Sequence, residues 1–320
     1  MSPPPPPLGR SRRKGGRADH VFDLALDDSE LSEVRGQFAQ GRWTRARSLL
    51  VTTGTDWDLR GHRVMALAAV PSAVGWASDW LLAEPESRDA ATLLACATVA
   101  KAQRPKAGTG ERARARKACL TAAALDRADP TPWLALMTLE RTHGSHEDTA
   151  RHFEEIRARH PEHHHAHHLM TAQLAEARPE NDPLHEVYDF AAWAAEQAPA
   201  DSPLAVLPVI AHAERFRVLV GAGALAGDPA ASGHWAGRRA RQVMKAAFDW
   251  WLEWEREDHP RHSVDLNFLA HAKISEGRPA EAAAIFHRIG THATAVPWSY
   301  AGRDPYPEFL AARTLALGAP

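Results

Sequence analysis

Residues 130–163 read PTPWLALMTLERTHGSHEDTARHFEEIRARHPEH, a pattern of two short helices joined by a turn. Apolar residues three and four positions apart lie on one face of a helix. The first such face is formed by Trp133, Leu136 and Met137. Gly144 interrupts the pattern, and Pro161 ends the second helix. The second apolar face, between these two residues, is formed by Ala150, Phe153 and Ile156. The stretch therefore predicts a helical hairpin that buries its apolar faces against neighbouring helices.

The same arrangement occurs twice more in the chain. The copy near the carboxyl end comprises Leu266, Leu269, Ala270, Gly277, Ala282, Phe286 and Ile289. A weaker copy near the amino end comprises Leu31, Val34, Phe38, Gly41, Ala46, Leu49 and Leu50. Both copies have a Gly-Arg turn that leads into the second helix, in ISEGRPAEAAAIF and FAQGRWTRARSLL. Separated copies with one turn chemistry indicate a repeated structural unit.

Residues 130–163 resemble a tetratricopeptide repeat, with a large residue early in the first helix and an aromatic residue late in the second. From about residue 46 to 214 the chain also resembles uncharacterised bacterial helical-repeat proteins, often actinobacterial, that are grouped as a domain of unknown function. The residues that carry this second resemblance are Trp57, Trp80, Pro85, Trp133 and Pro203. The resemblance implies an all-α, irregular right-handed α-solenoid of antiparallel helix pairs, and it implies no activity.

Changes in composition, and proline and glycine residues that interrupt helices, divide the chain into regions. The regions are a Pro/Arg-rich disordered tail (1–19), tetratricopeptide-like repeats (20–220), a Gly/Ala-rich loop (221–237) and carboxyl-terminal helices (238–313) that include a repeat at about 263–294. The only β-branched run, residues 217–220, is too short to found a sheet. The sequence therefore predicts an all-α fold.

Charge and cysteine content exclude several classes of function. The 38 Lys and Arg residues nearly balance the 40 Asp and Glu residues, so no overall positive charge attracts nucleic acid. Cys96 and Cys119, the only cysteines, cannot form a disulfide framework or a cysteine zinc site, and they are expected to be buried and inert. The apolar runs are shorter than the roughly 20 residues of a membrane-spanning helix. We expect a cytoplasmic protein with no membrane span and no nucleic-acid partner, and the oligomeric state stays open.

Histidines are numerous, 19 in 320 residues, and six of them occur in residues 159–174, RHPEHHHAHHLMTAQL. A helix that begins after Pro161 places His164 and His168 one turn apart, opposite a buried face that includes Ala166. This is the spacing at which two helical histidines jointly bind zinc or a similar divalent ion. The candidates for a third ligand are His160, His143, His146 and a carboxylate from a neighbouring helix. The favoured alternative is an exposed polar face with no bound ion.

An aromatic cluster lies on the helix expected at residues 238–258. Trp251 and Trp254 share a face with Met244 and are expected in the core. Trp250 points away from that face, so it either packs against a neighbouring repeat or is exposed for recognition. The candidate partner-binding residues are Trp250, His164 and His168.

Two functions fit these features. The favoured prediction is a non-catalytic scaffold that binds a protein or peptide on the concave surface of a repeat array. The alternative is a metal-dependent enzyme or accessory protein of a biosynthetic pathway that uses residues 160–168. The chain has no GxSxG elbow and no GxxxxGK[ST] loop, and we predict no catalytic residue and no cofactor other than this divalent metal.

Overall fold

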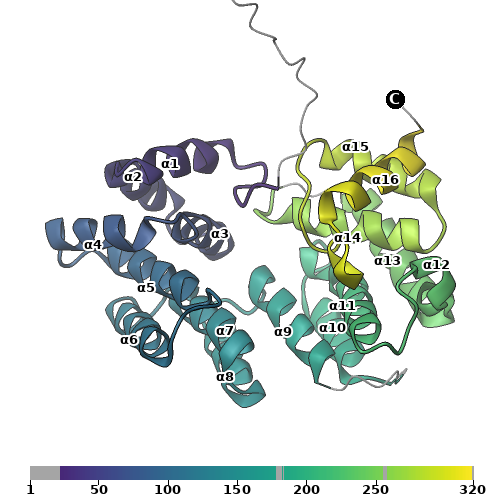
Figure 1. Ribbon diagram of the computed structural model, residues 1–320, viewed down its shortest axis with the longest axis horizontal. Coiled ribbons are helices and arrows are strands. Elements are labelled where there is room, and N and C mark those ends of the chain that lie inside the picture. Colours follow the sequence, from purple (N-terminus) through teal and green to yellow (C-terminus); the bar gives the residue numbers. More distant parts are fainter. Residues whose placement is uncertain (1–21, 178–181, 183, 255–257, 319–320) are drawn as a thin grey trace, which may run out of the picture.

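The computed structural model of the chain describes residues 22–177, 182, 184–254 and 258–318 (Figure 1). These residues form sixteen α-helices and three short 3₁₀ helices, and no strand occurs among them. The prediction of an all-α fold is confirmed. Residues 217–220, the β-branched run, lie inside helix α11.

The helices follow one another with short connections. The first eight are α1 (Ser29–Ala39), α2 (Trp43–Thr53), α3 (Trp57–Ala68), α4 (Ala73–Ala83), α5 (Arg88–Ala102), α6 (Thr109–Leu125), α7 (Thr131–His143) and α8 (His146–Arg157). The next eight are α9 (His164–Glu176), α10 (Glu186–Gln197), α11 (Leu207–Gly221), α12 (Pro229–Ser232), α13 (Arg238–Trp254), α14 (His262–Ser275), α15 (Pro279–Ile289) and α16 (Pro305–Leu317). The 3₁₀ helices are η1 (Pro203–Val206), η2 (His234–Ala236) and η3 (Tyr300–Gly302).

Short polar side chains fix where many of these helices begin. Asp28, Asp56 and Ser145 precede α1, α3 and α8, and each side chain accepts a hydrogen bond from a backbone N–H of the first turn. These caps satisfy donors that an α-helix leaves unpaired at its start. The helix starts therefore follow from local sequence chemistry.

The three helix pairs expected from the sequence are present as α1 with α2, α7 with α8, and α14 with α15. The Gly-Arg turns at Gly41 and Gly277 have φ angles of 87° and 79°, a conformation that glycine adopts without strain. The apolar residues expected to face the core are buried in the first and last pairs. In the middle pair Trp133 and Ala150 are half-buried, and Thr149 is the fully buried residue at the crossing.

Apolar side chains gather in two large clusters with a small one between them. One large cluster lies within α1 to α7, and the other lies within α9 to α16 and the segments that join them. The small cluster joins α7, α8 and α9 and comprises Leu134, Met137, Phe153, Ile156 and Ala166. Figure 1 shows α9 between the amino-terminal helices and the carboxyl-terminal helices. The first turn of α9 therefore lies where the two halves of the molecule meet.

Two expectations about tryptophans and loops differ from the structure. Trp251 is buried, but Trp254 is 42% exposed, so its placement in the core was wrong. Trp254 is the last residue of α13, where the neighbouring helices no longer cover its face. The segment 221–237, expected as a loop, contains α12 and η2, and its Trp235 packs against Phe216 and His271.

The two thiols behave as expected. Cys96 and Cys119 are both buried and free, and burial raises the pKa of Cys119 to about 12. A buried thiol with a raised pKa is a poor nucleophile because the thiolate is the reactive form.

No single helix in the described part of the chain is both long and apolar enough to cross a membrane. Helices α3 and α4 meet the length and composition criteria only when they are taken together, and the chain bends by 114° between them.

Candidate metal centre

The start of α9 is fixed by an aspartate from a distant part of the chain. Asp58, in the first turn of α3, accepts a hydrogen bond from the backbone N–H of His164 at 2.9 Å. Its second oxygen lies 2.8 Å from Nε2 of His160. Burial alone raises the pKa of Asp58, but the hydrogen bond with His160 and the charges of His163 and His164 outweigh it and lower the pKa. An ionised carboxylate at a helix N-terminus is stabilised by the unpaired N–H groups there.

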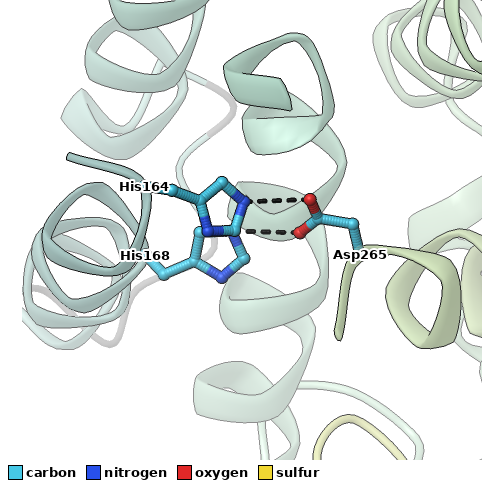
Figure 2. A group of neighbouring side chains, drawn as sticks. All are labelled: His164, His168 and Asp265. Atoms are coloured by element: carbon cyan, nitrogen blue, oxygen red, sulfur yellow. Dashed lines mark hydrogen bonds and ion pairs between the residues drawn. The ribbon is translucent and has the colours of Figure 1, made fainter. Parts of the chain in front are cut away.

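At the start of α9, two imidazoles face a single carboxylate (Figure 2). Nε2 of His164 lies 2.9 Å from Oδ2 of Asp265, and Nε2 of His168 lies 3.2 Å from Oδ1. The two Nε2 atoms are 3.1 Å apart. Asp265 lies in the first turn of α14, 101 positions after His164 in the chain. All three residues are buried, and their ligand atoms lie within 4.8 Å of one another.

These distances are compatible with a set of metal ligands. Atoms bound at about 2.0–2.1 Å to one tetrahedral zinc ion lie about 3.3 Å apart. Two N–H groups that both point at Asp265 cannot also hydrogen-bond each other, although their nitrogens are 3.1 Å apart. Oδ1 of Asp265 is buried, and Nε2 of His168 faces it at 3.2 Å without forming a well-aligned hydrogen bond. One cation between the three residues satisfies every contact.

The charge states favour the same conclusion. Burial lowers the pKa of His164 to about 3, and burial also lowers the pKa of His168. Both imidazoles are therefore neutral at pH 7, which is the form that binds metals. Burial acts to raise the pKa of Asp265, but the electrostatic interaction with His164 and the hydrogen bonds of His164, His168 and His259 lower it well below the usual range. The group thus carries one negative charge and two nitrogen lone pairs.

His259 adds a third imidazole nitrogen at the edge of this group. Its Nε2 lies 3.0 Å from Oδ2 of Asp265, and its ring centroid is 4.5 Å from that of His164. His259 lies in the segment before α14 and is partly buried. Its contact is with the carboxylate of Asp265, so His259 can orient that side chain from outside the group of three.

The structure brings together two of the three residues that the sequence singled out as metal ligands. His164 and His168 lie together, whereas the side chain of His160 pairs with Asp58. The third member of the group is a carboxylate, Asp265 of α14, which only the fold brings close to α9.

The expectation that His164 and His168 lie on an exposed face was wrong. The two side chains are 1% and 8% exposed, because α14 and the segment before it cover the face of α9 opposite the small apolar cluster. Nine histidines in the described part of the chain are buried, so they are not spread over exposed helical faces.

Trp250, a candidate for partner binding, is half-buried. Its Nε1 donates a hydrogen bond to the backbone oxygen of Ala200, at 2.8 Å. The indole thus packs on the turn between α10 and η1. Its contact is with a neighbouring segment of the same chain.

A cavity of about 840 Å³ begins at His168 and extends between α9, α11 and the start of α14. Pockets of this size are large enough to enclose a small organic molecule. An ion held by His168 would therefore lie at the wall of a cavity that can hold a substrate. A comparison with known protein families and with curated proteins finds no match to this chain.

Proposed function

We propose that this chain is a metal-dependent enzyme or accessory protein that binds one divalent transition-metal ion, zinc being the first candidate. The observation that carries the proposal is the buried group of His164, His168 and Asp265, whose ligand atoms come within 4.8 Å of one another from two separate helices. Nitrogen and carboxylate ligands of this kind suit zinc and its neighbours in the first transition row.

The number of ligands supports a chemical function more than a purely structural one. Catalytic zinc sites have three protein ligands and keep a fourth position for water or substrate, whereas structural sites are closed by four protein ligands. Zinc in such a site lowers the pKa of its bound water to about 7 and polarises carbonyl groups. His168 also lines the adjoining cavity, so a substrate bound there would lie beside the site.

Metal analysis of the untagged protein tests the proposal. We expect one stoichiometric ion in the wild type, and loss of that ion in the double variant His164→Ala, His168→Ala. His287→Ala, which removes an exposed histidine of α15, is the matched control and should keep the ion. Circular dichroism of each variant separates lost ligands from lost folding. Wild-type protein that is folded and free of metal after supply of zinc, iron and manganese would contradict the proposal.

A second proposal concerns the amino-terminal helices as a scaffold for a protein or peptide. Consecutive helix pairs stacked as an irregular right-handed α-solenoid of tetratricopeptide type would present the ends of α2 and α4 on one surface. Val51 and Leu82 are 59% and 80% exposed there, which favours an apolar contact. A groove of about 860 Å³ runs beside Val51 and Trp57.

Site-specific photo-crosslinking tests the scaffold. A crosslinker at position 51 should capture one partner reproducibly in host cells, and a crosslinker at exposed position 287 should not. The purified partner should bind Val51→Asp more weakly than wild type. Equal capture at both positions, or equal binding to both proteins, would exclude this surface.

A further inference from the structure

Arg261 is a partly buried cation without a counter-charge in direct contact. It precedes α14, and its Nε is buried with no hydrogen-bond partner in the described part of the chain. No hydrogen bond or ion pair of its side chain occurs among these residues, although Asp265 and Asp58 attract it from a greater distance. Burial lowers the pKa of Arg261 to about 10, so the guanidinium is still charged at pH 7. A charge that is partly removed from water without a partner is costly, and a ligand of opposite charge reduces that cost.

The guanidinium lies in the wall of the cavity that begins at His168. His62 and His165 line the same part of the wall, and Nδ1 of His165 is buried without a hydrogen-bond partner among the described residues. An imidazole offers at least one N–H donor in either protonation state. Arg261 and His165 thus form a place where an anion meets a charged donor and an imidazole donor.

The other charged groups of the cavity are already neutralised. Arg217 pairs with Glu176 and Glu214, and Arg141 pairs with Glu176. Asp23 pairs with Arg35. Of the arginines that line the cavity, only Arg261 lacks a direct carboxylate partner within the described residues, and the excess charge at this wall is a single positive one.

The remaining walls are mainly apolar. Leu169 of α9, Ile210 of α11 and Phe268 of α14 line the cavity together with Leu26 and Val264. A ligand that fills this space therefore needs an apolar body as well as one anionic end.

We propose that this cavity binds a small organic carboxylate, with its carboxylate group on Arg261 and its apolar body against Leu169 and Phe268. A planar guanidinium binds a carboxylate through two parallel hydrogen bonds. Asp58 and Asp265 lie near Arg261 and repel a doubly charged phosphate more than a singly charged carboxylate. Carboxylate binding at Arg261 does not require the metal. If the proposed metal-dependent function holds, small organic carboxylates are the class of substrate for that function.

Calorimetry with matched ligands on the full-length chain tests this inference. The probes are sodium decanoate, decan-1-ol and inorganic phosphate, each added to metal-free and zinc-supplied protein. We expect decanoate to bind wild type in both forms, and decan-1-ol and phosphate to bind at least about tenfold more weakly. Wild type that binds decan-1-ol or phosphate as tightly as decanoate, or that does not bind decanoate, would overturn the proposal.

Substitution of the arginine gives the second readout. Arg261→Met should weaken decanoate binding by about tenfold to a hundredfold, because a hydrogen-bonded ion pair is lost. Arg104→Met, at an exposed arginine, should leave it unchanged. Arg261→Met should keep any metal, and the double variant His164→Ala, His168→Ala should keep decanoate binding, so the two proposals can fail separately. Unchanged decanoate affinity in folded Arg261→Met would overturn the inference.

Discussion

Two aspartates face the start of α9, and their contacts differ in kind. Asp58 of α3 accepts the backbone N–H of His164 with one oxygen and contacts the ring of His160 with the other, so a helix cap and one histidine account for both oxygens. Asp265 of α14 faces ring nitrogens, those of His164, His168 and His259. The difference shows that a buried carboxylate is evidence of a metal site only when the helix backbone does not already account for it.

Replacing the second aspartate should have the largest effect on metal binding. Asp265→Asn removes the only charged ligand of the group, while the amide keeps the volume of the side chain. We expect zinc affinity to fall by more than about a hundredfold, because changes in residues behind metal ligands alone cost 10–100-fold. Competition with a chromophoric chelator measures the affinity. An unchanged affinity would mean that Asp265 is not a ligand.

Replacing the first aspartate should reduce stability and leave the metal in place. Asp58→Ala removes the cap of α9 and the partner of His160, which should lower the free energy of unfolding by about 2–3 kcal/mol. Urea unfolding of the metal-free protein measures this change. Loss of stoichiometric metal from folded Asp58→Ala would contradict the different roles assigned to Asp58 and Asp265.

A buried histidine without a carboxylate provides a contrast that depends on pH. His271 of α14 packs among Trp235, Trp298 and Tyr300, and burial lowers its pKa to about 3, compared with about 6.5 in an unfolded chain. Above pH 6.5 the ring is neutral in both states and has no effect on the pH dependence. As the pH falls below 6.5 the unfolded state binds a proton that the folded state does not, so stability decreases by about 1.4 kcal/mol per pH unit.

His271→Phe removes the ring that binds this proton. The pH dependence of the free energy of unfolding between pH 6 and pH 4 should therefore become smaller by about 1.4 kcal/mol per pH unit. Urea unfolding of metal-free protein at several pH values gives the slope. Exposed His287→Phe is the matched control and should leave the slope unchanged. A slope that does not change in His271→Phe would show that the ring already binds a proton in the folded protein.

Local patterns were sufficient to predict much of the fold. The apolar spacing and glycine turns of residues 130–163 and of the two other copies predicted helix pairs that the structure contains. The same reasoning placed His164 and His168 on one face of one helix, because that relation depends only on helical geometry.

Contacts between distant helices were not predictable in this way. Asp265 lies 101 positions from His164, and only the folded arrangement, in which α9 and α14 both pack against α11, brings them together. One signal was present in the sequence, since HPEH at 160–163 and HPRH at 259–262 precede the two helices that supply the ligands. Burial of His164 and exposure of Trp254 also depend on which neighbouring helix covers each face, and periodicity does not specify that neighbour.

Anomalous diffraction from crystals of the untagged, zinc-supplied protein tests the central claim most directly. The account predicts one strong anomalous peak between His164, His168 and Asp265, with metal–nitrogen distances of about 2.0–2.1 Å. Density at the same point should vanish in Asp265→Asn. A folded protein whose zinc lies elsewhere, or whose three side chains surround no metal, would contradict it.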